Sequence, residues 1–310
     1  MFKLPGLLSK NATQSELADF AELWAWQAGS FSMQTMWDAL GRDNENHYRG
    51  GPGDEDEANE NLAGEVMGVL SRREEASNGA YPFRIEGSGY LLRYIEELSE
   101  ERAEIYFYLL LCTRFDMQKE RVLAGKDGTA LFEKLTAHVL KNYLGAGRAR
   151  SVVFGTAIPG AFAGKVDWLC QELGEGGGFR SLDPKDPPLS GGDGKLDAVA
   201  WVPFSDLRPG KLVLFAQSKT GTHWRDTTTQ LQPRDFMNKW MWKHFIPEPM
   251  RVFCVAESVD DNRWHNVQAE SGILFDRCRM VDFAHSVPPE ILEEIRVWTQ
   301  AGARKLFDSL

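Results

Sequence analysis

The spacing of apolar residues changes near the middle of the chain. Up to about residue 145, apolar side chains recur at intervals of three and four residues, which is the pattern of amphipathic helices. Beyond that point, short apolar runs rich in β-branched and aromatic residues are separated by Gly, Pro and Asp, and such runs are typical of strands. The pattern therefore predicts an α/β protein whose first part is helical.

The first part is predicted to be an all-helical region. Residues 13–16 are Thr-Gln-Ser-Glu, a capping box ahead of an amphipathic helix that reaches residue 28, and a second helical stretch is expected over 90–117. Between them, residues 41–60 are polar and include the acidic run 54–57. This composition buries too little apolar surface to order a chain, so it predicts a mobile acidic loop.

The second part is predicted to alternate strands with helices. Strands are expected over 151–155, 196–202, 211–219, 251–256 and 273–275, and helices over 129–143, 162–173 and 289–306. A segment rich in Gly, Pro and Asp over 174–194 is predicted to be a loop. A break near 124–128 gives two domains, a helical N-terminal domain of residues 1–125 and an α/β domain of residues 126–310.

Composition and charge limit the kinds of function. A net charge of −10 argues against a protein that coats nucleic acid through bulk charge, so any nucleic-acid site must be local. The four cysteines form no CxxC pair and have no His at zinc-ligand spacing, which predicts reduced, mostly buried thiols. The N-terminal apolar run is too short for a signal peptide, and no segment reaches about 18 uninterrupted apolar residues. A soluble, cytoplasmic protein without membrane contact is expected.

Three polar residues lie within the apolar strands of the second part. Asp197 falls in one predicted strand, and Gln217 and Lys219 fall in the next, where the two-residue period puts both on one face. A carboxylate suits Mg²⁺, an amide oxygen is a weaker neutral ligand, and magnesium keeps several waters beside such sparse protein ligands. Lys219 would then lie beside the metal-bound water, where it could orient or deprotonate that water or offset charge on a phosphate.

This arrangement resembles the PD-(D/E)XK nuclease superfamily, in which a helix Glu, a strand Asp and a (D/E/Q)xK on the next strand surround the metal. Glu133, in the predicted helix upstream, matches the helix position, and the resemblance covers roughly residues 126–285. It implies a restriction-endonuclease-like core, which is a mixed central sheet flanked by helices. It also implies Glu133, Asp197 and Gln217 as ligands of Mg²⁺, for which Mn²⁺ could substitute, with Lys219 as the fourth catalytic residue. Gln217 stands where Asp or Glu is usual, as in the QxK subgroup that includes type IV restriction enzymes.

The residues around and after the Lys219 strand are locally basic. Between 205 and 251 the sequence holds eight Lys and Arg against four Asp and Glu, a surplus of +4 inside a protein of −10. Such charge could guide a nucleic-acid backbone to the site. Two tryptophans, Trp240 and Trp242, are candidates for stacking on bases. The residues predicted to contact DNA are Arg225, Arg234, Lys239 and His223.

Each of these residues also has a purely structural interpretation. Asp197 and Lys219 could form a strand-end salt bridge. Glu133 could be a solvated helix position, in which case Glu172 on a neighbouring helix is its replacement. Two residues of the segment after the Lys219 strand are interpreted as surface glutamines: Gln230 and Gln232.

The resemblance suggests a metal-dependent nuclease that hydrolyses phosphodiester bonds of DNA, as the effector of a bacterial defence system against phage or other foreign DNA. The sequence has no GxxxxGK[ST] phosphate loop and no GxSxG elbow, so nucleotide-driven work would need a partner ATPase. Nuclease cores of this kind commonly need restraint, which predicts a homo-oligomer or a separate sensor protein. The alternative is a catalytically inactive nuclease fold that serves as a binding or scaffolding module in a protein–nucleic acid complex.

Overall fold

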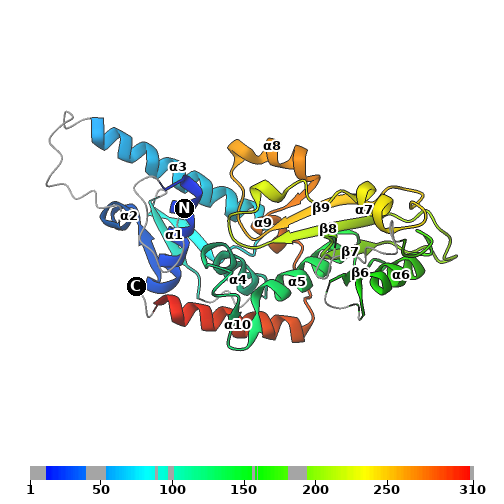
Figure 1. The fold of residues 1–310 in the computed structure, drawn as a ribbon. Helices are drawn as coiled ribbons and strands as arrows, with labels where there is room; N and C mark the ends of the chain where they lie inside the picture. The colour runs from blue at the N-terminus through cyan, green and yellow to red at the C-terminus, as the bar shows by residue number, and fades with distance from the viewer. Residues whose placement is uncertain are drawn as a thin grey trace.

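The protein is mixed α/β, and its computed structural model describes residues 12–39, 54–87, 90–96, 101–155, 158, 160–180 and 194–307 (Figure 1). The helices are α1 (Gln14–Ala28), α2 (Met33–Ala39), α3 (Asp54–Ala76), α4 (Glu101–Arg114), α5 (Gly128–Tyr143), α6 (Phe162–Leu173), α7 (Pro233–Trp240), α8 (Asp261–Ser271), α9 (Arg277–Asp282) and α10 (Pro289–Phe307). The strands are β1 (Ser30–Ser32), β2 (Phe83–Glu86), β3 (Leu91–Tyr94), β4 (Val122–Leu123), β5 (Lys126–Asp127), β6 (Arg150–Val153), β7 (Ala198–Trp201), β8 (Val213–Lys219), β9 (Met250–Val255) and β10 (Ile273–Phe275).

A five-stranded sheet forms the centre of the second part. Its strand order is β10-β9-β8-β7-β6, in which β6, β7 and β8 are antiparallel neighbours and β9 and β10 run parallel to β8. Each of these strands lies within two residues of its predicted position. The central strand β8 has a continuous apolar run over 213–216 because it is buried on both faces.

Helices cover both faces of this sheet. One face, which includes Ala200 and Leu214, packs into an apolar cluster with α4, α5 and α10. The other face, which includes Val199 and Phe215, packs against α6 and α7. Figure 1 shows α10 running below α4 and α5, with α6 and α7 at the far end of the molecule. Since side chains alternate along a strand, Gln217 and Lys219 belong to the face that carries α6 and α7.

The N-terminal part is not all-helical, which corrects the prediction. It contains a three-stranded antiparallel sheet in the order β1-β3-β2, and β3 lies inside the stretch predicted to be helical over 90–117. Phe31, Phe83 and Leu92, one from each strand, are buried in the cluster that also holds the apolar residues of α1. These tertiary contacts override the local helical pattern. Helix α1 itself begins with the predicted capping box, because Thr13 and Glu16 each bond the other's backbone amide.

The acidic run 54–57 is not a loop either. It forms the first turn of α3. Apolar residues further along, including Val66 and Leu70, hold the helix against α1. The rest of the predicted acidic loop, residues 41–53, lies outside the described residues, as do residues 181–193 of the predicted loop over 174–194.

One apolar cluster extends across the predicted domain boundary near residue 125. It reaches from Leu17 in α1 to Leu306 in α10, and α10 packs against both α4 and α5. The boundary itself stays a prediction. The apolar cores on either side of it are continuous.

Charged side chains of α1 are buried as well, which the apolar spacing did not predict. Three carboxylates on one side of the helix meet three arginines from α3, α4 and α9, namely Glu16, Asp19 and Glu22 with Arg73, Arg114 and Arg277. Arg277 also donates to the carbonyl of Ala256, directly after β9. The three negative and three positive charges balance, which is the condition for burying ions without a large penalty.

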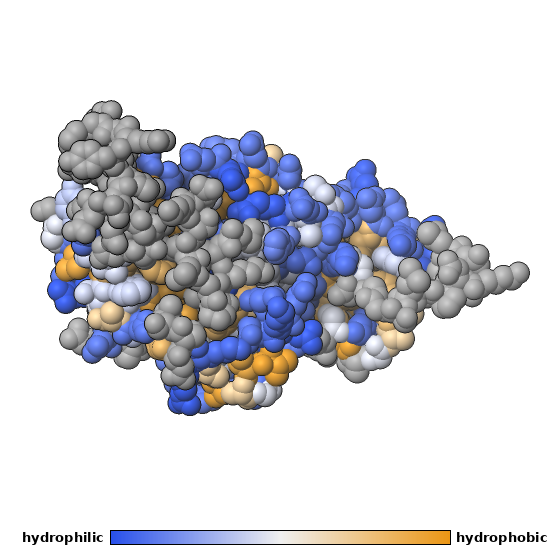
Figure 2. All heavy atoms as spheres, turned by 60° about the vertical axis from the view of Figure 1, so that its left-hand side comes forward, coloured by the Kyte–Doolittle hydropathy of each residue, from blue (hydrophilic) through white to orange (hydrophobic). Residues whose placement is uncertain are grey.

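The outer surface is mostly hydrophilic on the face seen in Figure 2, where coloured hydrophobic residues form small separate patches. In the part of the chain that the structure describes, no helix is both long and apolar enough to cross a membrane. All four cysteines are free and buried, as predicted.

Candidate metal centre

The antiparallel pair β7 and β8 brings Asp197 beside Gln217. Their regular ladder ends at Ala198 and Ala216, so Asp197 and Gln217 are the next residues on the two strands. The Asp197 amide donates to the Ala216 carbonyl at 2.9 Å, and the Asp197 carbonyl accepts from the Phe154 amide at 2.8 Å. The backbone of Asp197 is therefore held between β6 and β8.

Donors on β8 hold the carboxylate of Asp197. Its Oδ2 accepts from the Ser218 amide at 2.7 Å and from the Ser218 hydroxyl at 3.2 Å, and the side chain is 9% exposed. Cys254 lies two strands away on β9, where burial raises the pKa of its thiol and Asp197 raises it further. The Asp197 carboxylate is thus buried and held in a fixed orientation.

Gln217 has a buried oxygen that accepts no hydrogen bond. The side chain is fully buried, and its Nε2 donates to Oε1 of Gln230 at 3.2 Å. Its Oε1 finds no donor among the described residues, although leaving a buried acceptor unmet costs about 1–3 kcal/mol. An amide oxygen held in this way is suited to bind a cation. Gln230 is exposed, as interpreted from the sequence, and this contact puts its amide beside Gln217.

Lys219 ends β8 on the same face as Gln217 and is partly exposed. Its ammonium forms neither an ion pair nor a hydrogen bond with any described residue, so the strand-end salt bridge to Asp197 is not formed. The charge of Lys219 is therefore available to a substrate.

Glu133 lies on α5, which packs against β6, β7 and β8. Its carboxylate is close enough to Tyr108 to contribute, after burial and other neighbours, to raising the pKa of that phenol. The replacement candidate Glu172 is engaged elsewhere, because it binds Arg150 at 2.9 Å. Among the residues that can be described, no group of three or more His, Cys, Asp or Glu is arranged to hold a metal.

A buried glutamate holds the loop that follows Lys219. Glu257 accepts from the indole of Trp224 at 2.6 Å and from the guanidinium of Arg225 at 3.1 Å. It follows β9 at the sheet edge where Lys219 ends, since Lys219 pairs with Val255. Burial raises the pKa of Glu257, and Arg225 opposes that rise. The sequence did not single out Glu257 as a site residue, although a Glu directly after a predicted apolar strand indicates a position at the end of the sheet.

The residues predicted to contact DNA have different surroundings. Arg225 is bound by Glu257, and Arg234 pairs with Glu248 at 2.8 Å, so carboxylates already neutralise both. His223 is exposed, and the Lys239 ammonium lies 4.5 Å from the centre of the Trp240 ring. Of the two tryptophans considered for base stacking, Trp240 packs against Phe162 and Phe179, whereas Trp242 is 62% exposed.

Comparisons with known proteins found no relative of this chain. No family model, curated protein or solved structure matches the chain. The contacts of Asp197, Gln217 and Lys219 therefore carry the functional argument.

Proposed function

We propose that the chain is a metal-dependent nuclease that hydrolyses phosphodiester bonds of DNA. One observation carries the proposal: Gln217, the residue before the Ser218 that holds the Asp197 carboxylate, has a buried oxygen that accepts no hydrogen bond from the described residues. Lys219, two residues along the same face, adds an ammonium free to meet a phosphate. Two oxygen donors next to a cationic side chain suit hydrolysis of a phosphate ester.

The order of elements supports the same proposal. Helix α5, the antiparallel strands β6, β7 and β8, the crossover helix α7 and the parallel strand β9 follow one another along the chain. Glu133 on α5, Asp197 directly before β7, and Gln217 with Lys219 on β8 follow one another along the chain in the order that the PD-(D/E)XK resemblance implies. A restriction-endonuclease-like core is therefore part of the proposal.

The donor set fits a hard cation such as Mg²⁺ or Mn²⁺. Asp197 and Gln217 would hold the ion, and water would complete the coordination because magnesium accepts sparse protein ligation. Glu133, the third ligand that the resemblance implies, lies on α5, which covers the face of the sheet opposite to Gln217. When bound, the ion would supply an activated water and neutralise phosphate charge.

The protein's own residues prepare this site. The amide and hydroxyl of Ser218 fix the orientation of the Asp197 carboxylate. The bond to Gln230 directs the Gln217 amide so that its oxygen faces away from that partner. Lys219 would orient the attacking water or donate to a phosphate oxygen.

DNA as substrate, a role in antiviral defence, and control by self-association or by a partner ATPase or sensor protein are proposals that rest on the resemblance. The local surplus of basic residues over 205–251 and the exposed His223, four residues after Lys219, support nucleic acid as the substrate class.

The second candidate function is a nuclease-fold binding module without catalysis. It is favoured by the neutral ligand Gln217 together with the lack, among the described residues, of a three-residue acidic, His or Cys cluster.

Supercoiled plasmid incubated with the protein in Mg²⁺, Mn²⁺ and EDTA separates the two functions. Asp197→Ala and Lys219→Ala should abolish nicking, whereas the exposed controls Asp206→Ala and Lys119→Ala should retain it. Circular dichroism would confirm that each variant folds. Nicking that survives in both site variants would refute the proposed centre, and metal-independent DNA binding without nicking by the wild type would support the binding module.

A further inference from the structure

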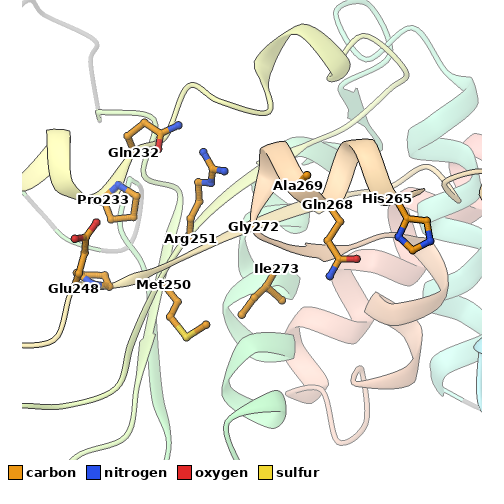
Figure 3. A pocket seen from close by; sticks show the side chains of 11 residues that line it. Gln232, Pro233, Glu248, Met250, Arg251, His265, Gln268, Ala269, Gly272 and Ile273 are labelled. Atoms are coloured by element: carbon orange, nitrogen blue, oxygen red, sulfur yellow. The ribbon is translucent and has the colours of Figure 1, made fainter. Parts of the chain in front are cut away.

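A groove of about 680 Å³ lies at the amino ends of β9 and β10, between the start of α7 and the last turns of α8 (Figure 3). It is separate from the candidate metal centre. Arg251, in the groove, is next to Phe215 in the β8–β9 pairing, whereas Lys219 is next to Val255. Four residues along a strand correspond to roughly 13 Å.

Arg251 carries an uncompensated positive charge in this groove. Its guanidinium donates to the backbone carbonyl of Glu270 but forms no ion pair with a described carboxylate. Burial lowers the pKa of Arg251, and no acidic neighbour among the described residues offsets that effect. A bound anion would supply the missing counter-charge, and a guanidinium presents planar donors that suit phosphate.

Neither Glu248 nor Glu270 pairs with Arg251. Glu248, which lines the groove, is bound by Arg234 at 2.8 Å. The carboxylate of Glu270 accepts from the Thr228 hydroxyl at 3.1 Å. Glu270 lines a different pocket, so Arg251 is the side chain of this groove whose charge has no described counter-ion.

Two neutral amides are held in defined orientations around Arg251. Gln268 accepts from the indole of Trp264 at 2.9 Å through its oxygen, which leaves its amide hydrogens for a ligand. Gln232 donates to the Thr229 carbonyl at 2.9 Å, which leaves its oxygen as an acceptor. Figure 3 shows Gln232 and Arg251 on one side of the groove and Gln268 with His265 on the other. A ligand here would meet donors and an acceptor together.

The same groove has an apolar wall. Met250 is 46% exposed, and Ile273 and Pro233 also line the surface. Helix α7 starts at Pro233 without a side-chain cap, so the positive end of its dipole adds to Arg251. The volume lies within the range of small-molecule sites, about 300–1,000 Å³.

From these contacts we infer that the groove binds a nucleoside phosphate, with the phosphate at Arg251 and the ring system against Met250 and Ile273. The ligand is either a free nucleotide or a nucleotide of a bound strand, since both present the same groups. The site does not use Asp197, Gln217 or Lys219, so it is independent of the proposed nuclease activity.

Calorimetric titration of the full chain tests this inference with four probes: AMP, adenosine, orthophosphate and a 5′-phosphorylated thymidine tetranucleotide. AMP should bind more tightly than adenosine or orthophosphate if the ligand is a free nucleotide. Arg251→Gln should weaken binding by roughly tenfold to a hundredfold, which is the loss of one charge-assisted contact. The exposed control Arg304→Gln and the metal-site variant Asp197→Ala should bind as the wild type does.

Binding of the tetranucleotide but not of AMP, with the same dependence on Arg251, would identify the strand as the source of the phosphate. The inference is overturned if neither AMP nor the tetranucleotide binds, or if adenosine binds as tightly as AMP. It is also overturned if Arg251→Gln leaves the affinity for the bound nucleotide unchanged. If Arg251→Gln does not fold, Gln268→Leu is the alternative test, because Gln268 is exposed and lies outside the strands. This substitution removes an oriented donor, so it should weaken nucleotide binding, and an unchanged affinity would overturn the inference.

Discussion

Replacing Arg277 by Met should break the buried ion network that ties α1 to the end of β9. The Arg277 side chain is fully buried and makes five hydrogen bonds, at 2.9–3.2 Å, to Asp19, Glu22, Thr113 and the carbonyl of Ala256. Methionine fills much of the same space but carries no charge. The three carboxylates of α1 would then face two arginines, and the network would change from neutral to −1.

Removing one partner from a buried ion pair costs about 3–5 kcal/mol, and we expect a loss of this size in the free energy of unfolding at pH 7. The loss should depend on pH. Burial alone would raise the pKa of Asp19, but Arg114, Arg277 and Arg73 together hold it well below its ordinary value. A depressed pKa contributes stability above the unfolded value, about 3.9, and that contribution disappears as the pH falls toward the folded value. Since Arg277→Met raises the folded pKa, the difference between the two proteins should shrink below about pH 4.

Urea unfolding followed by tryptophan fluorescence at pH 7 and at pH 3.5 measures both effects, with exposed Arg304→Met as the control. A loss of unfolding free energy below about 1 kcal/mol at pH 7 is the size expected for an exposed ion pair. Such a result would refute a stabilising role for the buried network. If the two proteins differed equally in unfolding free energy at both pH values, Asp19 would not be the cause of the pH dependence.

Three further predictions concern the site and the packing. Gln217→Glu should tighten Mn²⁺ binding about tenfold in calorimetry, because a carboxylate replaces a neutral ligand, and an unchanged affinity would remove Gln217 from the metal site. Gly128→Ala would put a methyl group 2.7–2.9 Å from the Trp298 ring and should destabilise by about 1–3 kcal/mol, whereas Gly64→Ala in α3 meets no atom within 4 Å and should be neutral or stabilising. Equal melting temperatures for the two Ala variants would contradict this. Because burial raises the pKa of Glu257, the wild type should lose stability relative to Glu257→Gln as the pH rises from 4.5. If the stability difference between the two proteins did not change with pH, the raised pKa of Glu257 would be excluded.

Long apolar patterns predicted their elements well. Helices α5, α6 and α10 begin and end within one residue of the predicted ranges 129–143, 162–173 and 289–306. Each buries one face against the core, and this burial imposes the helical period on the sequence. The strands of the central sheet were equally evident because their residues are buried on one or both faces.

Short elements held by distant partners were not predictable. Ser30 of β1 pairs with Arg93 of β3, more than sixty residues later, and neither segment has a long enough pattern to indicate a strand. The carboxylates of α1 were also missed. Asp19 and Glu22 look like the solvent face of an amphipathic helix, and only the fold shows that three arginines surround that face.

At the candidate site, the sequence predicted which residues stand on neighbouring strands but not how they are held. The proximity of Asp197 to Gln217 followed from strand order. The bonds from Ser218 to Asp197 and from Gln217 to Gln230 depend on register and on the path of the loop after β8, which no local pattern encodes.

The central claim is that Asp197 and Gln217 hold a divalent cation beside Lys219. Crystals of the wild-type protein soaked in Mn²⁺, measured at a wavelength where manganese scatters anomalously, test it most directly. The claim predicts an anomalous peak in direct contact with the Asp197 carboxylate and the Gln217 Oε1 atom, and no peak there in Asp197→Ala crystals. A map without manganese at these two oxygens, at a concentration that occupies other sites, would contradict it.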